Sequence, residues 1–230
     1  MKRKSFIHHK ASHKPKRHLY YADYTRNEDI ANGLTHLVGF FFAIYFLWDT
    51  LTLGGGLLHT ICYMIYGGSQ LAIYASSTIY HLQTDFRMKN IFKKVDHVVI
   101  YWAIAGGYTP FMMLNLRSTL AYVLVTIAWI LAVSGSLYKI FYIGKYPRFG
   151  IFTYVGMSLL SLIAIKPMME AMPMDSIVWL LIGGGFYLSG IFFYVRDNWY
   201  YNHAIWHLFV MGGTASHWWA LHQAFPATLQ

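Results

Sequence analysis

Long uncharged stretches constrain this chain of 230 residues more than any other feature of its sequence. A membrane-spanning helix needs about 20 apolar residues, and seven windows meet or approach that length. They are Asn32–Leu53, Leu57–Tyr80, Val98–Asn115, Thr119–Tyr138, Phe149–Ile165, Ile177–Tyr194 and Ala204–Ala220. In a bilayer each span must satisfy its own backbone hydrogen bonds, and the windows lack the alternation of a membrane barrel. We therefore predict an all-α polytopic membrane protein, a bundle of seven transmembrane helices.

The basic residues indicate which way this bundle faces. Of the 18 Lys and Arg residues, eight precede residue 27 and eight more follow the second, fourth and sixth windows. In a seven-helix bundle these segments share one side, and only Arg117 and Lys166 lie on the other. The positive-inside rule then predicts a cytoplasmic N-terminus, an extracytoplasmic C-terminus and a place in the plasma (inner) membrane. Membrane orientation accounts for the formal net charge of +9, so we expect no nucleic-acid partner.

The chain divides into three segments. Residues 1–26 form a basic tail that we expect to be disordered. This tail either binds anionic lipid headgroups, each basic residue contributing about 1 kcal/mol, or only determines the topology. Residues 27–222 form the membrane domain, and residues 223–230 form a short extracytoplasmic tail.

Ionisable side chains within the expected spans are the candidates for function, because they are costly to bury in a membrane. They lie on four of the expected helices, inside the windows or just beyond their ends. Given the predicted topology, most are at the cytoplasmic level, where we expect them to converge. The set consists of Glu28, Asn32 and His36; Ser77 and His81; Asp96 and His97; and His203 and His207, with His217 about 15 Å further along the last helix.

The pair His203 and His207 has the spacing of a metal site. Residues four apart lie one helical turn apart on nearly the same face. With His81 as the third ligand they would hold one tetrahedral metal, and Asp96 would orient or deprotonate a water at the open fourth position. All-histidine ligation favours zinc. In the alternative interpretation, both histidines are interfacial side chains that bond to the backbone or to headgroups.

Glu28, Asn32 and His36 recur every four residues and therefore share one helical face. Three histidines already fill the protein side of a catalytic zinc site, so we expect these residues, with His217, to support the ligands. Glu28 or Asn32 would orient the second ring nitrogen of a ligand or a basic loop residue, and His36 lies about 6 Å deeper. Alternatively, Glu28 only complements the dipole of its helix.

These motifs resemble those of the hemolysin III family, within the wider group of progestin and adiponectin receptors and alkaline ceramidases. The resemblance runs from residue 28 to residue 217 in the family's order. It rests on Glu28-Asp-Ile-Ala-Asn32-Gly-Leu-Thr35-His36, Ser76-Ser77-Thr-Ile-Tyr80-His81, Asp96-His97 followed by Ala105-Gly-Gly-Tyr108-Thr109-Pro110-Phe111, and His203-Ala-Ile-Trp-His207-Leu-Phe-Val with His217.

The resemblance implies a seven-helix bundle with zinc near its cytoplasmic face. The zinc ligands of related receptors carry over onto His81, His203 and His207, and the residues associated with the zinc-bound water onto Asp96 and Ser77. Ceramide hydrolases among the relatives imply zinc-dependent hydrolysis of a lipid amide, and some bacterial members imply a role in membrane lipid homeostasis. The family's name implies instead a pore-forming cytolysin. A receptor or sensor with structural zinc is the third alternative.

Overall fold

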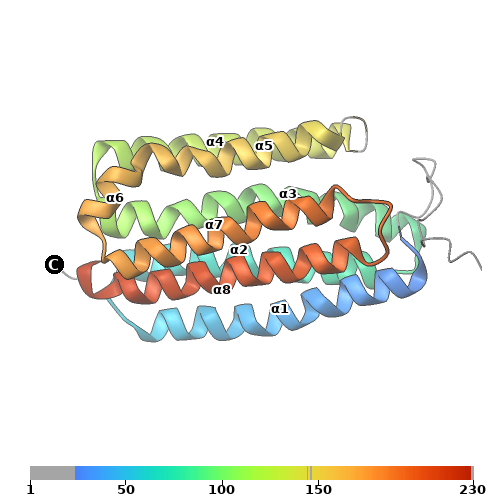
Figure 1. Cartoon of the computed structure of the whole chain (residues 1–230), viewed down its shortest axis with the longest axis horizontal. Coiled ribbons are helices and arrows are strands. Elements are labelled where there is room, and N and C mark those ends of the chain that lie inside the picture. The colour runs from blue at the N-terminus through green and yellow to red at the C-terminus, as the bar shows by residue number, and fades with distance from the viewer. Residues whose placement is uncertain (1–23, 144, 146, 229–230) are drawn as a thin grey trace, which may run out of the picture.

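The computed structural model describes residues 24–143, 145 and 147–228, and this part of the chain is helical, without strands. Seven helical rods lie side by side along one long axis (Figure 1). The rods are α1 (Arg26–Thr52), α2 (Leu57–Leu82), α3 (Phe86–Pro110) with the π-helical turn η1 (Phe111–Leu116), α4 (Thr119–Tyr142), α5 (Pro147–Leu159) with the 3-10 turn η2 (Leu160–Ala164) and α6 (Ile165–Ala171), α7 (Met174–Tyr194) and α8 (Asn202–Thr228).

Five of the rods are long and apolar enough to cross a membrane. They are Arg26–Thr52, Phe86–Leu116, Thr119–Tyr142, Arg148–Ala171 and Met174–Tyr194. The rods α2 and α8, with 26 and 27 residues, are comparably long but carry more hydroxyl, amide and imidazole groups. Large apolar side chains cover the outside of the bundle, such as Phe41 at 62% and Phe152 at 80% exposure, which is far more apolar surface than water tolerates. The protein is therefore a polytopic helical membrane protein.

Local sequence determines where α1 begins and ends. Thr25 and Glu28 form a capping box, in which the Thr25 hydroxyl accepts from the Glu28 N–H and the Glu28 carboxylate accepts from the Thr25 N–H. After α1, three successive glycines have φ angles of +84°, +94° and +87°, which side-chain-bearing residues rarely adopt. These glycines, at 54–56, turn the chain into α2, which packs against α1.

The described helices reach beyond the expected segment limits at both ends. α1 begins at Arg26, whereas residues 1–23 of the expected basic tail lie outside the described residues. At the other end, α8 continues to Thr228 and so contains most of the segment 223–230.

The arrangement of the rods places distant parts of the chain together. α8 packs against α7 and α1, α2 packs against α1 and α3, and α4 and α5 run together along one side (Figure 1). The start of α1 and the α2–α3, α4–α5 and α7–α8 connections lie at one end of the bundle (Figure 1). Within the described part of the chain, the segments that carry most of the basic residues therefore share an end.

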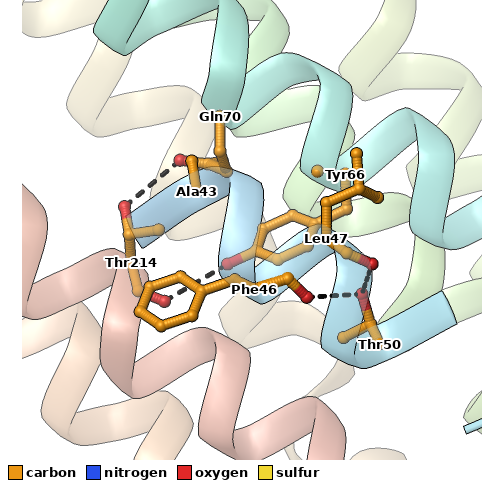
Figure 2. Close-up of a pocket in the computed structure, with 8 residues that line it drawn as sticks. Ala43, Phe46, Leu47, Thr50, Tyr66, Gln70 and Thr214 are labelled. Atoms are coloured by element: carbon orange, nitrogen blue, oxygen red, sulfur yellow. Dashed lines mark hydrogen bonds between the residues drawn. The ribbon is translucent and has the colours of Figure 1, made fainter. Parts of the chain in front are cut away.

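The interface of α1, α2 and α8 is polar in the middle of the bundle. The Thr214 hydroxyl accepts from Tyr74 at 2.8 Å. It also donates to Gln70 Oε1 at 3.2 Å, and Tyr66 donates to the Thr214 carbonyl at 3.4 Å (Figure 2). Tyr66, Gln70 and Thr214 border a cavity of about 10 Å³, enough for one water. The polar side chains of α2 and α8 thus face inward, away from lipid.

Close packing of α2 and α3 yields a prediction about two adjacent glycines. A Cβ atom at Gly106 would lie 2.5 Å from Ser69 Oγ and 3.3 Å from the Ile65 carbonyl oxygen, whereas one at Gly107 would meet nothing within 4 Å. Gly106→Ala should therefore reduce the free energy of unfolding by the about 1–3 kcal/mol typical of overpacking. The melting temperature in detergent should fall accordingly. Gly107→Ala should leave it unchanged or raise it, since alanine favours helix. Equal melting temperatures would contradict this packing of α3 on α2.

Candidate metal centre

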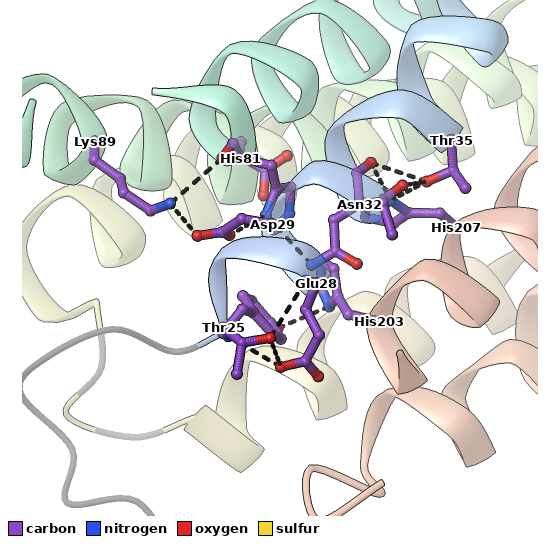
Figure 3. A network of polar contacts seen from close by, with 12 residues as sticks. Thr25, Glu28, Asp29, Asn32, Thr35, His81, Lys89, His203 and His207 are labelled. Atoms are coloured by element: carbon purple, nitrogen blue, oxygen red, sulfur yellow. Dashed lines mark hydrogen bonds and ion pairs between the residues drawn. The ribbon is translucent and has the colours of Figure 1, made fainter. Parts of the chain in front are cut away.

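Three histidine side chains meet near the end of the bundle where α1 and α8 begin (Figure 3). His81 comes from the last turn of α2, and His203 and His207 come from the first two turns of α8. One nitrogen of each ring lies within 4.8 Å of those of the other two rings, and all three residues are buried. Within the described ranges, this is the one such group of three His, Cys, Asp or Glu residues. The fold therefore brings together the three histidines that the sequence singled out.

Two of the rings are held at Nδ1 by residues of α1. His81 Nδ1 lies 3.1 Å from Asp29 Oδ1 and 3.5 Å from Asn32 Nδ2. His207 Nδ1 lies 3.0 Å from the Asn32 carbonyl oxygen and 3.1 Å from Thr35 Oγ1 (Figure 3). A carboxylate or carbonyl oxygen can only accept, so Nδ1 of each ring carries the proton and Nε2 keeps its lone pair.

The third ring is held by the residue that precedes the α1 cap. Tyr24 OH lies 2.9 Å from His203 Nδ1, and the two rings pack with their centroids 4.9 Å apart. The Nε2 atoms of His203 and His207 are buried and form no hydrogen bond within the described residues. Imidazoles anchored at one nitrogen, with the other directed into a shared space, are the arrangement that histidine-ligated metals use.

Ser77 and Asp96 lie beside the cluster, on α2 and α3. Ser77 precedes His81 by one helical turn, and its hydroxyl side chain is fully buried. The buried Asp96 carboxyl is within electrostatic range of that hydroxyl and of Lys93. A carboxylate that could take up a proton therefore lies next to the turn of α2 that leads into His81.

Comparison with known proteins identifies the family of the chain. The family described as "Haemolysin-III related" matches residues 24–218. The chain is 37% identical to the hemolysin-3 homolog of Bacillus subtilis over 84% of its own length and 92% of that relative's. It is 36% identical to hemolysin-3 of Bacillus cereus, over 82% and 87% of the two chains. The chain belongs to the hemolysin III family.

Animal proteins also match this hemolysin III chain. The human monocyte to macrophage differentiation factor is 30% identical to it, over 84% of this chain and 83% of the human protein. The family match begins at Tyr24 and ends after His217, so it includes every residue of the candidate centre.

Among the expected supporting residues of this hemolysin III protein, Asn32 bonds to the cluster itself, whereas Glu28 connects two helix starts. Glu28 Oε1 accepts from the Tyr201 N–H at 3.2 Å, and Oε2 accepts from the Thr25 N–H and hydroxyl at 2.9 and 2.7 Å. The Glu28 carboxylate, buried at 1% exposure, therefore ties the start of α1 to the residue just before α8.

The other two expected supporting residues, His36 and His217, lie in different places. His36 stacks on His207 with centroids 3.4 Å apart, and neither of its ring nitrogens has a hydrogen-bond partner within the described residues. His217 lies ten residues beyond His207 on α8, about 15 Å along the helix. Its Nε2 is 3.3 Å from the Leu180 carbonyl oxygen and its ring packs against Tyr187. His217 therefore joins α8 to α7 and does not support the histidine cluster.

The contacts of Tyr24, Asp29 and Thr35 with the histidine rings were not among those expected from the sequence. A spacing of four residues linked Asn32 to Glu28, although Asp29, three residues before Asn32, is as close to it on the helix surface. The carboxylate of Asp29, at the start of the helix, was a signal from which its contact could have been inferred. Tyr24 lay in the segment set apart as a disordered tail, and nothing in the sequence marks its contact with α8.

Proposed function

We propose that this hemolysin III protein is a zinc-dependent hydrolase that cleaves a lipid amide at the cytoplasmic face of the plasma membrane, where it would serve membrane lipid homeostasis. The carrying observation is the cluster of three buried imidazoles with nitrogens within 4.8 Å of one another. Gathering these polar rings away from water costs free energy unless another group satisfies their nitrogens. A cation between them would do so.

The residues present fit zinc. Histidine binds zinc at about 2.0–2.1 Å in tetrahedral sites, and small side-chain rotations would bring nitrogens within 4.8 Å onto one ion. His81, His203 and His207 would hold the metal, each supported behind by a hydrogen bond at Nδ1. Zinc held by three histidines supplies a Lewis acid and a fourth position at which water becomes acidic near neutral pH.

Asp96 and Ser77 would handle the proton in this reaction. The Asp96 carboxylate would accept a proton from the attacking water and return it to the leaving amine, so that water is divided between the acyl carbon and the nitrogen. The Ser77 hydroxyl, buried beside the Asp96 carboxyl, would bond to the reacting groups. A buried carboxylate beside a headgroup-level metal suits a bond at the polar end of a lipid.

The proposed orientation rests on charge and on the shared end of the bundle. Of 18 basic residues, all but Arg117 and Lys166 lie in or next to the segments that we place in the cytoplasm. The start of α1 and three of the connections share an end (Figure 1), which is the end that holds the histidine cluster. With α2 and α8 also crossing, the chain would span the membrane seven times. The basic tail, outside the described residues except for its end, would bind anionic headgroups.

The names of the relatives favour a second function, a pore-forming cytolysin, since two of them are hemolysin-3 proteins. A pore needs a hydrated path, and the cavity between α1, α2 and α8 holds about one water. A receptor or sensor with structural zinc would bind metal without turnover.

Purified protein in liposomes distinguishes the three functions. Cleavage of N-acyl lipids would support the hydrolase, and ion flux without cleavage would support the cytolysin. Zinc binding without cleavage or ion flux would support the receptor.

The zinc proposal predicts the metal content of purified protein. The chain should hold about one zinc, and His81→Ala, His203→Ala or His207→Ala should each lower the occupancy sharply, because two imidazoles make a poor tetrahedral site. His59→Ala, His97→Ala and His222→Ala serve as matched controls and should keep the metal. Mass spectrometry of the metal content measures this. Full occupancy in His207→Ala would remove the proposed site.

The role of Asp96 predicts a separation of metal binding from turnover. Asp96→Asn keeps the shape and the hydrogen bonding of the side chain but removes the base. Zinc content should therefore stay, while hydrolysis of an N-acyl lipid should fall by about 10²–10⁴-fold. Zinc lost together with activity would make Asp96 a ligand or a support of one. Unchanged turnover would contradict the hydrolase mechanism.

The proposed topology predicts where fused reporters work. Two reporters are fused after Gln230, one that works only outside the cytoplasm and one that works only inside it. The first should be active and the second inactive, because the C-terminus faces outward. The same two reporters in the α2–α3 connection, after Thr84, should give the reverse pattern. A cytoplasmic C-terminus would contradict both the seven crossings and the cytoplasmic position of the site.

A further inference from the structure

Behind one of the three histidines lies a chain of two charged groups, which the described residues do not provide at Nδ1 of the other two. Lys89 Nζ is 2.6 Å from Asp29 Oδ2, and Asp29 Oδ1 is 3.1 Å from His81 Nδ1 (Figure 3). The three residues come from the first turn of α3, the first turn of α1 and the last turn of α2. The Asp29 side chain is 10% exposed and that of His81 is fully buried.

The partner of each ring decides how much electron density reaches its other nitrogen. His207 bonds to a carbonyl and a hydroxyl, and His203 bonds to a phenol, all of which are neutral. His81 has a carboxylate instead, and a carboxylate on one ring nitrogen makes the other a more basic ligand and fixes its direction. The Lys89 ammonium binds the same carboxylate. Its positive charge partly offsets the negative charge of Asp29 and so reduces the effect of Asp29 on the His81 ring.

We propose that Asp29 and Lys89 form an electrostatic relay that sets the metal affinity of the centre through His81. Asp29 strengthens His81 as a ligand, and Lys89 limits that effect, so the two act in opposite directions. Both are positioning residues, since they touch the ligand and not the metal. The relay rests on the proposed zinc site and adds to it the control of how tightly the metal is held.

A structural ion pair between α1 and α3 would behave differently. Lys89 Nζ also lies 3.4 Å from the His81 carbonyl oxygen, so the pair could simply fasten the end of α2. In that case the loss of either charge would loosen the same contact, and both substitutions would weaken metal binding. The sign of the Lys89 effect therefore separates the two roles.

The experiment measures the zinc dissociation constant of the purified full chain by competition with a chelator. Asp29→Asn keeps the shape and removes the charge, and it should weaken zinc binding by about 10–100-fold, the usual loss for an outer-shell partner. Lys89→Met should tighten binding by about 5-fold, because it removes one positive charge several ångströms from a dication. The controls are Asp197→Asn and Lys94→Met, exposed residues of the same charges, which should change nothing.

Cobalt(II) in place of zinc gives a readout that a structural role would not move. Asp29→Asn should shift the visible absorption bands of the bound cobalt, because the ligand field of His81 changes, and Asp197→Asn should not. Unchanged zinc affinity in Asp29→Asn, or weaker binding in both Asp29→Asn and Lys89→Met, would overturn the relay. Should Asp29→Asn fail to fold, the sign of the Lys89→Met effect still decides. Wild-type protein that binds no zinc would instead contradict the proposed function.

Discussion

A buried imidazole needs a partner for each ring nitrogen, and the candidate centre of this bundle depends on that requirement. Three rings meet with one nitrogen each directed to a shared space, so the opposite nitrogens must be satisfied from outside. Helix α1 and the residue before its cap supply all three of these partners. α1 can do so because it packs against both α2 and α8. The Glu28 carboxylate keeps that geometry by bonding to the chain just before α8.

The same requirement explains why two of the seven rods are less apolar than the rest. α2 and α8 contribute the histidine cluster at one end and the contacts among Thr214, Gln70 and Tyr74 further along. Exposed to lipid, these groups would be costly, whereas in the interior they bond to one another. The five apolar rods present large side chains outward, and polar α2 and α8 are sheltered by packing against them. The bundle therefore buries the polar groups of α2 and α8, as it buries Glu28, Asp29 and Asn32 of α1.

The fold class and the three histidines could be predicted from the sequence, because span length and four-residue spacing are local properties that the bundle preserves. Asp29 could not be chosen over Glu28, because neighbouring residues point about 100° apart and only the packing of α2 decides which one reaches a ring. The contact of Tyr24 with His203 joins residues 179 apart in sequence, so no local pattern announces it. The depth of His217 along α8, in contrast, follows from its ten-residue distance from His207.

The candidate centre is also a link between distant parts of the fold. Its histidines and their partners come from α1, α2 and α8, and Lys89 adds the first turn of α3. A ligand that binds only the folded chain stabilises it by an amount that grows with the logarithm of its concentration relative to its dissociation constant. Metal bound here would therefore strengthen the association of α1, α2 and α8 in particular. The α4 and α5 pair, which contributes no residue to the histidine cluster, would gain only indirectly. Occupancy of the site and integrity of this half of the bundle would then be one equilibrium.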